Sequence, residues 1–196
     1  MACNGTPRSD KESFATIRTV LAAGLLLAAL HATSLAGWRF TKIIDTTGGT
    51  FSNFSYEPSL NSWQSTAFVA QKSDGTIGIY TSAGGNVFAT VAETGGTYLG
   101  LRIHPYINNS NTVVFAATLS NGVTDGIFTK TGAAAVVPVA TTGAVDFTSL
   151  DEEPSINNNG VVAFRASRLI GGGQMGIYTK SGSTITTIMN NQPEYG

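Results

Sequence analysis

The sequence is poor in cysteine, histidine and charged residues. Of its 196 residues one is Cys, two are His, and only 12% are Asp, Glu, Lys or Arg. One cysteine excludes a disulfide framework and a zinc site built on cysteines. The net charge of −1 excludes an electrostatic nucleic-acid binder, because such proteins carry a clustered basic surplus. Low charge together with 23 Gly favours an all-β protein over a helical one.

The first 36 residues differ from the rest. Three basic residues, the last of them Arg18, precede an uncharged apolar run from Thr19, and small residues at Ser34 and Ala36 mark a cleavage point after Ala36. This order predicts a helical secretory signal segment over residues 1–36. The alternative is an uncleaved N-terminal anchor, although the apolar core is short for a membrane span of about 20 residues. In both cases we expect the remainder to be extracytoplasmic, secreted or at the cell surface, with no other membrane span.

Residues 37–196 repeat one pattern three times. Prolines recur 47 and 49 residues apart, each followed by an Asn, a Phe and a Gly-Ile-aromatic triplet in the same order. The landmarks are Pro58, Asn61, Phe68 and Gly78–Tyr80; Pro105, Asn108, Phe115 and Gly126–Phe128; and Pro154, Asn157, Phe164 and Gly176–Tyr178. We place the repeats at about 38–92, 93–140 and 141–189.

Each landmark predicts a local conformation. The residue before a proline is extended, and Asn and Gly favour tight turns because they tolerate positive φ. Short β-branched and aromatic runs between such turns are typical of strands buried on both faces. Each repeat is therefore predicted to be four short antiparallel strands, followed by a link of 11 or 12 residues at 93–103 and 142–152.

Four-stranded units that recur every 40–50 residues are typical of β-propeller blades. The predicted fold is all-β: a propeller-like array of three four-stranded antiparallel blades plus an extra N-terminal strand at 38–45. The alternative is a β-sandwich of about twelve short strands. Because propellers have about four to eight blades, we expect a truncated ring whose open blade edges favour self-association.

One repeat carries a recognisable motif. Asn157, Gly160, Ala163 and Phe164 match N-x-x-G-x-x-A-F in full, whereas the other copies have Gln64 or Asn111 for the glycine and Val114 for one alanine. Over residues 38–189 the chain resembles the NxxGxxAF tandem-repeat family of exported bacterial proteins. The resemblance implies an extracytoplasmic repeat protein with a signal peptide, and supplies no catalytic residues. In this resemblance the motif residues are structural: Asn61, Phe68, Asn108, Phe115, Asn157, Gly160, Ala163 and Phe164.

One set of residues could bind a metal ion. Glu57, His104 and Glu153 precede the three prolines, so an array of blades would bring them to one channel mouth. Two carboxylates and an imidazole could bind Zn²⁺ or Ca²⁺. The alternative is that each is a solvated loop residue. No other cofactor is expected.

No nucleophile and base pair stands out, since His104 is the only histidine after residue 36. We therefore expect a binding or surface module with a protein or glycan ligand, and no catalysis. The rival hypothesis is a secreted hydrolase or lyase with an acidic/His site at the channel mouth. Aromatic residues between the repeats would pack under the blades or form a binding rim: Phe51, Phe54, Tyr56, Tyr98 and Phe147.

Overall fold

The chain is all-β wherever the structure describes it. The computed structural model describes residues 40–102, 104–143, 147–168 and 174–190, and every regular element in these ranges is a strand. No helix within these ranges is long and apolar enough to cross a membrane. The signal segment expected at residues 1–36 lies outside them. The strands belong to one compact unit that begins at Thr41.

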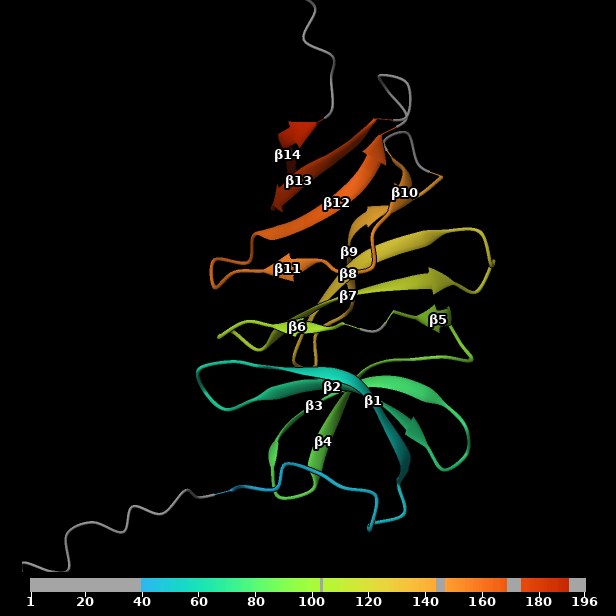
Figure 1. The fold of residues 1–196 in the computed structure, drawn as a ribbon, viewed down its shortest axis with the longest axis vertical. Coiled ribbons are helices and arrows are strands. Elements are labelled where there is room, and N and C mark those ends of the chain that lie inside the picture. Colours follow the sequence, from blue (N-terminus) through green and yellow to red (C-terminus); the bar gives the residue numbers. More distant parts are fainter. Residues whose placement is uncertain (1–39, 103, 144–146, 169–173, 191–196) are drawn as a thin grey trace, which may run out of the picture. The chain divides into compact units, whose positions relative to one another are not determined.

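The strands form three antiparallel sheets, with the second between the other two (Figure 1). The first sheet has the order β1 (Phe51–Leu60), β2 (Thr66–Lys72), β3 (Ile77–Gly84) and β4 (Val87–Glu93). The second has β5 (Tyr98–Leu101), β7 (Thr112–Leu119), β8 (Asp125–Thr131) and β9 (Val137–Thr141), with β6 (Tyr106–Ile107) also beside β7. The third has β10 (Phe147–Leu150), β12 (Val162–Arg168), β13 (Met175–Ser181) and β14 (Thr184–Asn190), with β11 (Ser155–Ile156) beside β12.

The three sheets share their irregularities. Each has a β-bulge or register shift near the start of its first strand, beginning at Phe51, Tyr98 and Phe147. Each has another between its last two strands, directly after Ile79, Ile127 and Ile177. A bulge increases local twist, so equivalent bulges give the sheets the same twist at the same place. The prediction of three antiparallel sheets of about four strands is confirmed, and the described residues form no closed ring.

The prediction that links of 11 or 12 residues join the sheets is wrong. β5 and β10 lie within them, at residues 98–101 and 147–150, and supply the first strand of the second and third sheets. In the first sheet the same path is one continuous strand, β1. In the other two it is broken before the proline into pieces of four and two residues. Such short pieces carry too few residues for a two-residue hydrophobic period to be recognised.

The prediction of an extra N-terminal strand is also wrong for the residues of it that the structure describes. Residues 40–45 have no strand conformation, and Trp38 and Arg39 lie outside the described residues. The segment is held beside the first sheet by the main-chain NH of Asn86, which donates to the carbonyl of Ile43 at 3.3 Å, and by Ile44, which packs on that sheet. It forms no ladder, and one hydrogen bond does not make a strand.

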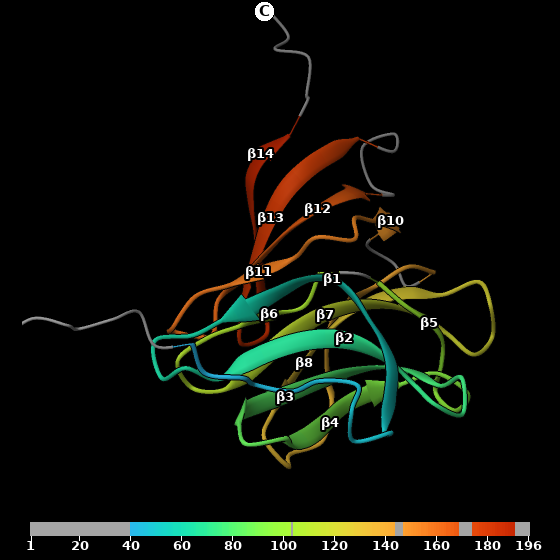
Figure 2. The ribbon, with the colours of Figure 1, turned by 60° about the horizontal axis from the view of Figure 1, so that its bottom comes forward.

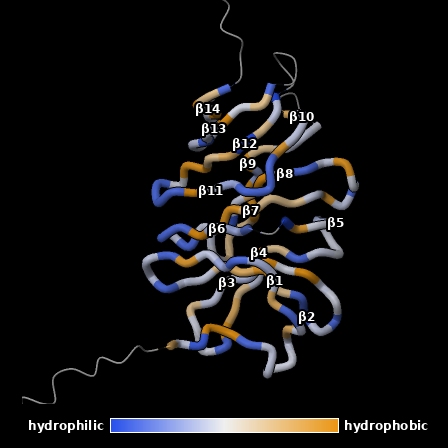
Figure 3. The backbone as a smooth tube through the Cα atoms, in the orientation of Figure 1, coloured by the Kyte–Doolittle hydropathy of each residue, from blue (hydrophilic) through white to orange (hydrophobic). Residues whose placement is uncertain are grey.

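Each sheet has an aromatic face and an aliphatic face, and unlike faces meet. The aliphatic face of the first sheet packs on the aromatic face of the second, and the second packs on the third in the same way. Figures 1 and 2 show the three sheets following one another in this order. The first interface contains Ala67, Val69, Ile79, Val91 and Ala92 against Tyr98, Ile107, Val113, Phe115, Ala117 and Phe128. The second contains Val114, Ala116, Ile127, Val139 and Ala140 against Phe147, Val162, Phe164, Ala166 and Tyr178. Hydrophilic residues gather in the loops that join the strands (Figure 3).

The aromatic faces explain the Gly-Ile-aromatic triplets. In each sheet the aromatic ring lies over the glycine two residues before it, and the rings of the first strand pack edge-on against it. A Cβ on Gly126 would overlap the ring of Phe128, and a Cβ on Gly78 would overlap Tyr80. Glycine is therefore required by the space that the ring occupies, since φ is not positive at these positions.

This constraint can be tested with two alanine substitutions. Gly126→Ala must displace the buried Phe128 ring, and we expect a loss of about 1–3 kcal/mol in the free energy of unfolding, measured by urea denaturation. Gly100→Ala is the matched control, because that glycine also lies in a strand of the second sheet and a Cβ there meets nothing within 4 Å. Equal stability of the two variants would contradict the proposed ring contact.

Tyr80 couples this core to a surface ion pair. Its hydroxyl donates to Glu93 Oε1 at 3.0 Å, and Lys72 Nζ lies 2.5 Å from the same oxygen. Burial, followed by this hydrogen bond, raises the pKa of Tyr80 well above its ordinary value. Burial also raises the pKa of Tyr98.

The raised pKa values of Tyr80 and Tyr98 predict how the free energy of unfolding changes at alkaline pH. Above about pH 10 the unfolded chain loses tyrosine protons that the folded chain retains, so the free energy of unfolding should fall as pH rises. We expect lower urea midpoints at about pH 11 than at about pH 9, with a smaller drop for Tyr80→Phe. A midpoint in the wild type that does not fall over this interval would contradict the assignment.

Candidate functional site

The three predicted metal ligands do not form a cluster of three. His104 Nε2 lies 3.5 Å from Glu153 Oε1, and these side chains are 20% and 64% exposed. Glu57 is exposed on β1. The described part of the chain contains no group of three or more His, Cys, Asp or Glu side chains able to hold a metal ion. The structure therefore brings together His104 and Glu153, as a partly solvated pair.

The acidic run that contains Glu153 is matched by bases. Asp151 Oδ2 lies 2.6 Å from Arg165 Nε, and Glu152 Oε1 lies 2.8 Å from Arg102 Nη1. The second pair joins two sheets, because Arg102 follows β5 and Glu152 follows β10. Such exposed pairs are worth at most about 1 kcal/mol each. Each carboxylate of the run faces a basic side chain, an arrangement that suits orientation of the sheet ends more than acid–base chemistry.

The motif asparagines make the most regular polar contacts of the molecule. Asn61 and Asn108 are buried, with exposed fractions of 7% and 4%. Asn61 Nδ2 donates to the carbonyl of Asn108 at 3.0 Å, and Asn108 Nδ2 donates to the carbonyl of Asn157 at 2.9 Å. We call these two bonds the asparagine rungs. They link equivalent turns of successive sheets.

The same side chains also close their own turns. Asn108 Oδ1 accepts from the main-chain NH groups of Ser110 and Thr112 at 3.0 and 2.9 Å, and Asn61 and Asn157 accept equivalent bonds. An amide is needed because one side chain must accept within its turn and donate to the next sheet. Sequence analysis predicted the turn but not the rung. A signal for the rung was present, because Asn occurs in all three copies of the motif whereas its glycine occurs in one.

The remaining motif residues have clear positions. The motif glycine position has positive φ in every sheet, 65° at Gln64, 55° at Asn111 and 77° at Gly160. The phenylalanines are all buried on the aromatic faces: Phe68, Phe115 and Phe164. Ala163 is half-buried in β12, on the other face of the third sheet.

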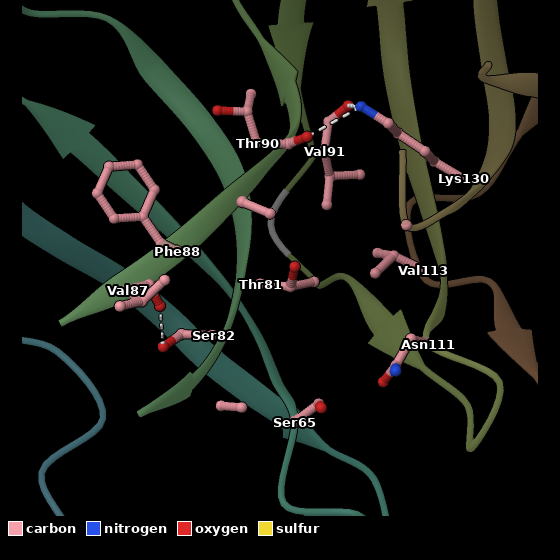
Figure 4. A pocket seen from close by; sticks show the side chains of 13 residues that line it. Ser65, Thr81, Ser82, Val87, Phe88, Thr90, Val91, Asn111, Val113 and Lys130 are labelled. Atoms are coloured by element: carbon pink, nitrogen blue, oxygen red, sulfur yellow. Dashed lines mark hydrogen bonds between the residues drawn. The ribbon is translucent and has the colours of Figure 1, made fainter. Parts of the chain in front are cut away.

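A groove runs between the first and second sheets. Its volume is about 300 Å³, and β3, β4 and the ends of β7 and β8 line it (Figure 4). Lys130 Nζ reaches across to β4 and donates to the carbonyls of Thr90 and Val91 at 2.9 and 3.3 Å. Lys180 makes the equivalent bonds from the third sheet to the second. These lysine bonds join neighbouring sheets. Among the described residues that line the groove, Lys130 is the one titratable side chain, so they form no acid–base pair.

The aromatic residues between the predicted repeats divide into two groups. Phe51, Tyr98 and Phe147 are buried at the first positions of β1, β5 and β10, so for them the packing alternative is confirmed. Phe54 and Tyr56 remain 36% and 61% exposed on the first sheet.

No known protein family, curated protein or solved structure matches the chain.

The asparagine rungs can be tested against an internal control. Asn108→Ala removes one rung from a buried position and leaves the part-buried NH groups of Ser110 and Thr112 without their acceptor, so we expect a loss of about 2 kcal/mol in the free energy of unfolding. Asn157→Ala removes the same turn bonds, but at an exposed turn where water replaces them, so its cost should be about 1 kcal/mol or less. Urea denaturation at low protein concentration measures both. Equal losses would show that the rung contributes nothing.

Proposed function

We propose that this chain is an extracytoplasmic tandem-repeat β protein whose propeller-like blades form a binding or surface module. The asparagine rungs are the observation that carries the proposal. The one polar side chain common to all three motif copies is used, in the first two, to join a sheet to its successor. A motif whose conserved chemistry joins units is typical of a structural repeat, in which each unit contacts its neighbours.

The propeller-like assignment is supported by the likeness of the sheets. They share two bulge positions, an aromatic and an aliphatic face, and a lysine that reaches back to the preceding sheet in the second and third. Equivalent turns meet at one side of the stack, as they do around the axis of a propeller. Membership of the NxxGxxAF family remains a proposal, supported by positive φ at all three glycine positions of the motif.

Binding is favoured over hydrolysis by the state of the carboxylates. A hydrolase or lyase at this edge of the sheets would need a carboxylate free to accept or donate a proton. The three carboxylates from Asp151 to Glu153 instead face Arg165, Arg102 and His104. The exposed Glu57 on β1 forms no cluster with His104 and Glu153 in the described part of the chain. A ligand would then be a protein or a glycan that contacts exposed aromatic side chains such as Phe54 and Tyr56.

The extracytoplasmic assignment is supported by the sequence of residues 1–36 and is tested by export. When the full chain is produced in bacteria, we expect a product that begins at Gly37 in the periplasm or the medium, identified by intact mass. Leu26→Arg should retain the unprocessed chain in the cytoplasm, because a charge interrupts the apolar core. Ala36→Phe should be translocated without cleavage at this site. A wild-type chain of full mass in the cytoplasm would contradict the proposal.

A further inference from the structure

The aliphatic face of the third sheet has no covering sheet in the described part of the chain. Ile79 and Ile127 are fully buried in the interfaces below the second and third sheets, whereas the equivalent Ile177 is 46% exposed. On the last strands, Ala140 is 7% exposed and the equivalent Met189 is 68% exposed. The third sheet therefore presents to solvent the face that the other two sheets bury.

The first sheet presents part of the opposite face. Pro105 and Pro154 are fully buried beneath a preceding sheet, but the equivalent Pro58 is exposed. Ile107 is 7% exposed and the equivalent Leu60 is 65% exposed. Ile43 and Ile44 lie over this face, where they line a pocket with Phe54, Pro58 and Phe68, and the rings of Phe51, Phe68 and Tyr80 on the face are buried. Leu60, next to the turn of Asn61, stays exposed.

The hydrogen-bonding groups at the two ends are also complementary. Among the described residues Asn157 Nδ2 has no acceptor, although the equivalent Nδ2 atoms of Asn61 and Asn108 each donate to the next sheet. The carbonyl of Asn61 lies where the carbonyls of Asn108 and Asn157 accept those bonds. A third rung therefore needs only the turn of another first sheet.

We propose that the third sheet of one copy of this chain docks on the first sheet of a second copy, head to tail. The contact extends the stack at the asparagine turns, covering Ile177 and Leu60 and adding a rung from Asn157 to the carbonyl of Asn61. It lies between sheet faces. A head-to-tail contact gives a closed ring if its rotation closes, and otherwise a filament. Two copies bring six sheets, within the range of about four to eight that closed propellers use.

Sedimentation of the purified protein tests the contact. The full chain, isolated with whatever N-terminal processing the cell performs, is expected to associate reversibly as its concentration rises. Ile177→Glu and Leu60→Glu each place a carboxylate in the buried contact, and each should weaken association at least about tenfold. Val123→Glu is the matched control, because Val123 is an apolar residue 80% exposed in a turn of the middle sheet, and it should associate as the wild type does.

Mixing the two variants distinguishes a head-to-tail contact from a symmetric one. Each variant keeps one intact end, so an equimolar mixture should form a pair that neither variant forms alone. If two third-sheet faces met each other, Leu60→Glu would associate normally and mixing would not rescue Ile177→Glu, which overturns the proposal. A wild type that stays monomeric at every attainable concentration overturns it as well.

The fold of each variant is checked by circular dichroism and its urea midpoint. Both substituted residues are about half exposed or more, so the monomer should remain folded. Should either glutamate variant fail to fold, the threonine variants at the same positions replace it in the same experiment. The result is independent of the export experiment, because association is measured on the isolated protein.

Discussion

The structure depends on a buried side-chain amide that serves two sheets at once. Asn61 and Asn108 each accept two main-chain NH groups of their own turn and donate to the carbonyl of the next turn. Hydrophobic faces alone would allow neighbouring sheets to slide, because burial is not directional. The rungs fix where one sheet stops on the next, and Lys130 and Lys180 fix a second point, on the last strand of the preceding sheet. Two polar contacts at separate places define a unique stacking position.

Within each interface the packing is set by rings that lie over glycines. The Gly-Ile-aromatic triplet puts an isoleucine on one face of the central strand and folds the aromatic ring flat on the other. Consequently one short segment supplies both the aliphatic surface for the following sheet and the aromatic surface for the preceding one. This explains why unlike faces meet at both interfaces.

Much of this was accessible from the sequence, and what was missed has physical causes. The landmarks predicted the all-β class, the turns and three strands of every sheet, because Pro, Asn and Gly act through local backbone preferences. The short strands β5 and β10 were not predicted, because four residues are too few to show a two-residue hydrophobic period. The rungs could not be predicted from the sequence, because the donor and the acceptor of each lie 47 or 49 residues apart. The shared left-handed turn was also hard to recognise, because its positive-φ position is Gln64, Asn111 or Gly160 in the three sheets.

The candidate metal site shows that residues at equivalent positions of a repeat need not form one cluster. Repetition placed Glu57, His104 and Glu153 at the same position of successive units, but the structure pairs only His104 with Glu153. A stack brings each residue close to its nearest equivalents, so three units supply neighbours and not a common centre. In the second sheet, which other sheets cover on both faces, only the edges and turns remain for charged residues, in keeping with the low charge of the sequence.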